Sequence, residues 1–327
     1  MRNRLAAIAI ASGCVLSGAA SYAQTPPFPT RPITVVVPFP AGGPTDALVR
    51  VLSDPMRTSL GQPLIVENVS GATGSIGVGR VAQARPDGYT VSIGNTSTHV
   101  VNGAIFPLKY DLLTDLEPVA LLGSNPLLLA SKNAVPAKDL RELIAWVKAT
   151  PRPVSTGTPG VGSIPEVVGI LFENLTGTRL QFVRYRGAAP APQDLIAGQI
   201  DMIFLQASNL LPQVHAGGIR AYAVTAPTRL NSAPEIPSVD EAGLPGLHAT
   251  VWSGFWVPKG TPKDIIAKLN AAVIEALADA AVRQRLADLG LEIPSRDELT
   301  PESLGRLQRA EAEKWWPIVK AANIKPE

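Results

Sequence analysis

The chain has 327 residues, of which 46% are hydrophobic and 17% are charged. It carries 29 Lys and Arg residues against 27 Asp and Glu residues, so its formal net charge is only +2. This balance argues against the strongly basic surface that binds nucleic acid or anionic membranes. About 300 residues remain after the N-terminal leader described next, and that length favours two domains.

Residues 1–23 have the three parts of a secretory signal peptide. Arginines stand at positions 2 and 4, residues 5–10 form an apolar run, and residues 21–23 give a small-x-small cleavage pattern. The apolar run is too short to span a membrane. We therefore expect a chain that is exported and loses this leader.

The single cysteine of the chain, Cys14, lies inside the leader. The mature protein would then have neither a disulfide nor thiol chemistry, and its stability would come from a large core. Residues 11–14 faintly resemble a lipoprotein box, but an aliphatic residue is usual where Ala11 stands. We therefore favour export without a lipid anchor over a lipidated Cys14.

The most informative stretch runs from Thr34 to Asp46 and reads TVVVPFPAGGPTD. Three consecutive valines predict a strand that is buried on both faces, as in a parallel sheet. Gly42 and Gly43 would let a ligand approach the backbone closely, and the amides at the start of the next helix suit an anion. The alternative is a plain strand-to-helix turn with Asp46 as a helix cap.

Residues 24–124 then follow the order strand, helix, strand, helix, strand, which predicts an α/β unit with a parallel sheet. Ligands of such sheets bind beyond the carboxyl ends of the strands, where the loops at Ala41 and Asn95 fall. The apolar run 119–130 predicts a crossing into a second domain, broken by Gly123-Ser124-Asn125-Pro126. We assign 125–248 to this second domain and 249–327 to the first.

The second domain repeats the opening pattern. A short strand leads into the Gly-rich loop 156–163, and a helix over 164–175 follows. Further strands are predicted at 179–185, 202–205 and 219–225. The chain is expected to return to the first domain through residues 251–257.

The sequence gives little evidence for a catalytic site or a metal site. His99, His215 and His248 are scattered, which argues against a metal site. Neither Gly-rich loop ends in the GK[ST] of a phosphate-binding loop. Ser75 lies in a near match to the serine-hydrolase elbow, but polar turn sequence precedes it instead of a strand, so we favour a helix cap.

Three further charged residues are assigned structural roles. Arg184 and Arg186 alternate along a strand-like run and would share one face, either in solvent or toward the cleft. We favour solvent, because buried arginines are rare. Asp201 is interpreted as a turn residue rather than a ligand-binding group.

Taken together, short motifs throughout the mature chain resemble the substrate-binding proteins of tripartite tricarboxylate transporters, often called Bug receptors. They occur in family order: Arg31-Pro32-Ile33, PFPAGG with Asp46, ENVSGATGSIG, ARPDGYT, GTPGVGS, YRGAAPA, GQIDMIF, AVTAPTR, PSVDEAGLPG, WSGFWVPKGTP and EKWWPIVKAANIK.

The resemblance implies a type II-like periplasmic-binding-protein clamshell in which each domain is a mostly parallel sheet flanked by helices. Such a receptor binds a small carboxylate between its domains and delivers it to membrane transporter subunits. We expect a monomer that is not an enzyme and has no cofactor, metal or nucleic-acid partner. A sensory receptor for a membrane kinase and an exported serine hydrolase are the alternatives.

In the family, the first strand–helix loop and the Gly-rich loop of the second domain hold one carboxylate, largely through backbone groups and waters. Other positions face the far end of the ligand. Asp46 would then brace the loop amides rather than touch an anion. The residues that match these positions are Phe39, Ala41, Gly42, Gly43 and Asp46, then Thr158, Gly160 and Ser163, and finally Ser97 and Thr98.

Two positions depart from the family pattern. Many relatives have His where Glu166 stands, and many have Asp where Leu205 stands. Loss of an acid at 205 disfavours a cationic ligand end. Leu205 with Trp252 and Phe39 suggests an apolar or aromatic wall, so we expect an aromatic or otherwise hydrophobic carboxylate.

Overall fold

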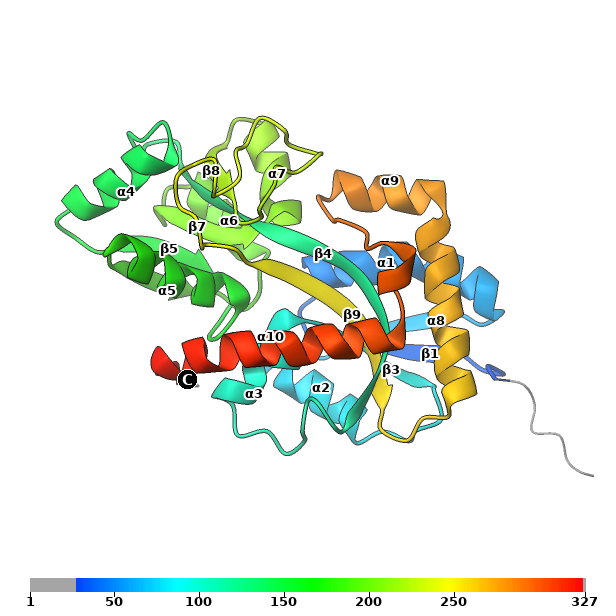
Figure 1. Ribbon diagram of the computed structural model, residues 1–327. Helices are drawn as coiled ribbons and strands as arrows, with labels where there is room; N and C mark the ends of the chain where they lie inside the picture. The colour runs from blue at the N-terminus through cyan, green and yellow to red at the C-terminus, as the bar shows by residue number, and fades with distance from the viewer. Residues whose placement is uncertain (1–27, 326–327) are drawn as a thin grey trace, which may run out of the picture.

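The structure is a computed structural model that describes residues 28–325. The leader 1–23 and its Cys14 lie outside the described residues. The described residues form a nine-stranded sheet with helices packed around it; eight strands follow one continuous hydrogen-bonded path, and the ninth pairs with one of them off this path. Two α/β halves, linked by two crossing strands, make up the molecule (Figure 1).

The first half is built from residues 28–106 and the C-terminal helices. β2, β1 and β3 pair in parallel, so the carboxyl ends of β1 and β3 lie at one edge of the sheet. Its first elements are β1 (Ile33–Val37), α1 (Pro44–Leu60), β2 (Leu64–Asn68), the 3₁₀ turn Ala72–Gly74, α2 (Ser75–Ala82), β3 (Thr90–Asn95), the π-helical turn Ser97–Val101 and α3 (Asn102–Ile105).

The two halves are joined by the antiparallel strands β4 (Leu116–Lys132) and β9 (Thr250–Pro258). β4 is continuous through 123–126, where the sequence predicted a break. Pro126 is tolerated because β4 changes neighbours there. It pairs with β9 up to Pro126 and with β7 (Met202–Gln206) from Leu127 onward, so the missing N–H of proline falls at the exchange.

The second half repeats the opening of the first. β5 pairs in parallel with β6 and β7, while β7 and β8 are antiparallel to β4. Its elements are α4 (Leu140–Ala149), β5 (Val154–Thr158), α5 (Ile164–Thr176), β6 (Leu180–Arg184), α6 (Pro190–Ile196), β7 (Met202–Gln206), α7 (Ala207–His215) and β8 (Ile219–Val224).

The C-terminal segment returns to the first half. Its elements are α8 (Lys263–Ala278), α9 (Ala280–Asp288), the 3₁₀ turn Arg296–Glu298 and α10 (Pro301–Ala321). α8 packs beside α1 on the first sheet, and α10 lies along the crossing strands (Figure 1). Each face of the sheets is therefore covered, which explains the nearly continuous apolar runs of the strands. Among the described helices, none combines the length and apolarity needed to cross a membrane.

Candidate functional site

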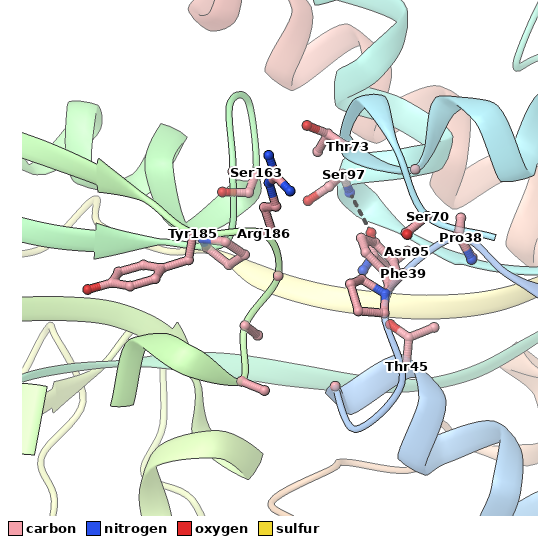
Figure 2. Close-up of a pocket in the computed structure, with 18 of the residues that line it drawn as sticks. Pro38, Phe39, Thr45, Ser70, Thr73, Asn95, Ser97, Ser163, Tyr185 and Arg186 are labelled. Carbon is pink, nitrogen blue, oxygen red and sulfur yellow. Dashed lines mark hydrogen bonds between the residues drawn. The ribbon is translucent and has the colours of Figure 1, made fainter. Parts of the chain in front are cut away.

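Two loops in corresponding positions face each other across a cavity of about 690 Å³. The first follows β1 and precedes α1, and the second follows β5 and precedes α5. Figure 2 shows the two walls, with Phe39, Thr45 and Ser97 on one side and Ser163 and Arg186 on the other. The cavity therefore lies between the halves, at the carboxyl ends of parallel strands.

The first loop is held by Asp46 from behind. Gly42 has a φ of +85°, which favours glycine, and its N–H donates to Asp46 Oδ2 at 3.0 Å. Arg50 pairs with both oxygens of Asp46, and Asn68 Nδ2 donates to Oδ1 at 3.1 Å. Burial raises the pKa of Asp46, but these hydrogen bonds together outweigh burial and leave the pKa lowered. Asp46 therefore braces a loop amide, as the sequence predicted.

The second loop is held in the same way. The N–H of Gly162 donates to Glu166 Oε2, and Arg184 Nε donates to Glu166 Oε1 at 2.7 Å. Glu166 is buried, with 1% of its surface exposed. Arg184 and Arg186 are both exposed, as the sequence predicted, but both also line the cavity, and Arg184 pairs with this buried acid.

Hydrogen bonds connect the halves at the cavity. Thr73 Oγ1 donates to the carbonyl of Val161 at 3.0 Å, and the N–H of Ile164 donates to Ser97 Oγ at 3.0 Å. Ser97 of the first half thus satisfies an amide at the start of α5 in the second. These contacts hold the two walls together around the cavity.

The amides at the start of α1 are free. Pro44 has no N–H, and the N–H groups of Thr45 and Asp46 donate to no residue that the structure describes. The first turn of a 17-residue helix carries a partial positive charge. The N-terminus of α1 therefore offers unused donors at the cavity wall.

The charge of the lining is positive. Among the described residues that line the cavity there is no Asp, Glu, Lys or His, and the charged side chains are Arg184 and Arg186. The acids Asp46 and Glu166 stand behind their loops and are not in the lining. Free amides, and a lining that contains Arg186 but no described acid, make this cavity suitable for an anion.

The structure brings some of the predicted binding residues together and leaves others away from the cavity. Residues in the lining are Phe39, Ala41, Gly43, Ser97, Gly160 and Ser163. Residues beside these loops but outside the lining are Gly42, Asp46, Thr98 and Thr158. Thr98 is buried and bonds Asn95 and His99, whereas the buried Oγ1 of Thr158 has no partner.

Leu205 and Trp252 do not reach this cavity. Leu205 alternates with Phe204 along β7 and faces a buried apolar cluster instead. Trp252 on β9 donates through Nε1 to Glu311 at 3.4 Å and lines a second cavity of about 480 Å³. Of the three residues expected to form an apolar or aromatic wall, only Phe39 lines the cavity.

Several lining residues were not predicted. Gln206 ends β7, is 7% exposed, and its Oε1 has no partner within the described structure. Thr73 and Thr45 also contribute. The signal for Gln206 was its place directly after the predicted strand 202–205, at the edge where ligands bind.

The residues considered for a helix cap, a catalytic or metal site, or a turn make other contacts within the fold. Ser75 is the first residue of α2, and Gly74 precedes it without a side-chain cap, so the predicted cap was wrong. Ser75 Oγ accepts from Asn102 Nδ2 at 3.1 Å, while His215 and His248 pair with Glu235 and Asp240. Asp201 is a buried partner of Lys132 and Arg152 rather than a simple turn residue.

An anion-compatible cavity between two α/β halves linked by crossing strands defines a periplasmic-binding-protein fold. Residues 48–324 match the family described as tripartite tricarboxylate transporter family receptor, and the chain belongs to this family. Its members are substrate-binding receptors.

Similar proteins span nearly the whole chain. BugT of Bordetella pertussis is 33% identical over 94% of this chain and 94% of its own length. MatC of Rhodopseudomonas palustris, solved with bound malate, is 40% identical with a TM-score of 0.84, covering 89% of this chain and 100% of that one. An R. palustris protein solved with adipate is 32% identical with a TM-score of 0.86, covering 92% and 100%.

Proposed function

We propose that this protein is a periplasmic receptor that binds a small carboxylate between its two halves and delivers it to the membrane subunits of a tripartite transporter. Its role is binding rather than catalysis. Export by the leader 1–23 accounts for the location. We propose that residues 24–124 with 249–327 make up one domain and residues 125–248 the other.

The free amides at the start of α1 carry this proposal. Thr45 lines a cavity whose described lining has no acid, and the N–H groups of Thr45 and of the adjacent Asp46 have no partner among the described residues. Helix N-termini bind carboxylates in this way. The loop at Gly160 and Ser163 supplies the opposite wall. Two similar proteins that hold malate and adipate, both dicarboxylates, support the same ligand class.

The remaining predicted residues have assignable roles in this scheme. Phe39, Ala41 and Gly43 form the first wall, while Gly42 and Asp46 keep it in shape. Ser97 closes the far side, with Thr98 and Thr158 supporting the loops from behind. We propose that the protein acts as a monomer without cofactor, because the site lies within one chain.

A thermal-shift panel of mono-, di- and tricarboxylates tests the proposal. A ligand at a hundredfold excess over its dissociation constant should stabilise the protein by about 3 kcal/mol. Isothermal titration should then give one site per chain, and chromatography should recover the ligand unchanged. Absence of any shift across the panel, or conversion of the acid to another compound, would refute the assignment.

A further inference from the structure

Arg186 is a charged residue of the cavity wall whose guanidinium has no partner among the residues that the structure describes. It makes no hydrogen bond or ion pair with any residue between 28 and 325. Arg184, by contrast, pairs with Glu166. Of the two arginines in the lining, Arg186 is therefore the one whose charge no described acid balances.

The backbone on both sides of Arg186 is fixed. The N–H of Tyr185 donates to Thr158 at 2.8 Å, and the N–H of Gly187 donates to Pro159 at 3.1 Å. Tyr185 is also anchored through its hydroxyl, which donates to Asp194 at 2.6 Å. An arginine on such a backbone is positioned for binding, because the main chain is already ordered and loses little conformational entropy when a ligand binds.

The side chain is directed into the cavity. Figure 2 shows Tyr185 pointing away from the opposite wall, while the guanidinium of Arg186 lies beside Ser163 and faces the side that carries Ser97. A guanidinium presents a planar fork of donors that matches a carboxylate with two parallel hydrogen bonds. The cavity of about 690 Å³ has room for a ligand with more than one anionic group.

The cavity therefore contains two separate sets of anion-binding groups. One is the neutral amide of Thr45 in the lining, with the amide of Asp46 next to it, and the other is the cation of Arg186. Neutral donors suffice for one carboxylate. A ligand with a single carboxylate bound there would leave the charge of Arg186 unmatched, whereas a second anionic group could pair with it.

We propose that Arg186 binds a second anionic group of the ligand and makes the receptor selective for dicarboxylates over monocarboxylates of equal length. This inference rests on the proposed function. It adds that a side chain of the second half recognises the second charge, whereas the first carboxylate depends on backbone amides.

Isothermal titration of matched acid pairs tests the proposal. The pairs are succinate with butanoate and adipate with hexanoate, titrated into the wild type, Arg186→Gln, Arg186→Lys and the control Arg141→Gln. Arg141 is an exposed residue of α4 outside the cavity. Arg186→Gln should weaken the tighter-binding dicarboxylate at least tenfold and its monocarboxylate partner less than threefold. Arg186→Lys should retain part of the preference, and Arg141→Gln all of it.

The outcomes separate this inference from the proposed function. Equal weakening of both members of a pair, or no weakening in Arg186→Gln, overturns the role of Arg186 while carboxylate binding stands. Failure of all four acids to bind the wild type overturns both. Circular dichroism should show an unchanged melting temperature for Arg186→Gln, because Arg186 has no partner in the described fold.

Discussion

The N–H group of Gly42 donates to Asp46 Oδ2 at 3.0 Å, and this pair is repeated by Gly162 and Glu166 in the other half. In both loops a glycine with positive φ precedes an acid four residues later, and an arginine pairs with that acid. Both acids lie outside the cavity lining. They order the loops from behind, where they repel a bound anion less than they would from the wall.

Asp46→Asn tests the brace of the first loop. The variant keeps the size of the side chain but loses the charge that pairs with Arg50. We expect the free energy of unfolding at pH 7, measured in urea, to fall by about 1–3 kcal/mol.

The pH dependence of this effect has a defined sign. The folded-state pKa of Asp46 is below 3.8, so its stabilisation is present above pH 3.8 and is lost as the pH falls through the folded-state value. The difference in stability between wild type and Asp46→Asn should therefore shrink below pH 3.8. A difference that stays constant down to pH 2 would contradict this role.

His99 should make the protein sensitive to acid. It is fully buried and stacks on Trp256 with ring centroids 3.8 Å apart, and burial lowers its pKa from 6.5 to about 3. Unfolding therefore takes up a proton between pH 6.5 and 3, so stability falls as the pH drops through this window. The expected slope is about 1.4 kcal/mol per pH unit.

His99→Gln should remove this contribution. Urea unfolding at pH 6.5, 5.5 and 4.5 would give a shallower loss of stability in the variant than in the wild type. Equal slopes would show that another group takes up the proton.

Ser97→Ala tests the contact between the halves. The change leaves the buried N–H of Ile164 without its acceptor, which should cost about 1–2 kcal/mol and weaken carboxylate binding. Ser53→Ala is the matched control, because the Ser53 hydroxyl bonds a carbonyl within α1, away from the cavity. If both variants bind carboxylate as tightly as the wild type, this contact does not contribute to ligand capture.

Gly162→Ala and Gly177→Ala distinguish a steric clash between the two halves from backbone strain alone. Their φ values are +69° and +66°, so both substitutions carry a similar penalty of about 1–2 kcal/mol. A methyl group at 162 would come within 2.0 Å of Ile105 in the other half, whereas one at 177 meets open space. Carboxylate affinity should therefore drop in Gly162→Ala and persist in Gly177→Ala. Ile105→Ala added to Gly162→Ala should recover binding, and failure to do so would argue against the clash.

The elements around the opening loop were predictable because their signals are local. Three valines before a Gly-rich loop indicated β1, and the repeat of this pattern at 156–163 indicated the second wall. The continuous strand β4 was not predictable from Gly123 to Pro126. Such residues usually interrupt a strand. β4 tolerates them because its neighbouring strand changes from β9 to β7 there, and this change is a property of the tertiary fold.

The positions of the charged residues in the cavity lining were not predicted, for a similar reason. Alternation placed Arg184 and Arg186 on one face, but the partner of Arg184 is Glu166, 18 residues earlier in the chain. Leu205 and Gln206 are neighbours, yet strand alternation sends one into a core cluster and the other to the cavity. To predict which of two adjacent residues faces a ligand, one must know the strand register.

Hydrogen–deuterium exchange with a carboxylate that binds in the titration panel tests the location of the site most directly. We expect slower exchange for amides in both loops, 41–46 and 160–163, when the acid is bound. Residues 248–252 and 292–298, which border the second cavity, should exchange as before. Protection confined to those second-cavity residues, with both loops unchanged, would contradict the assignment of the site.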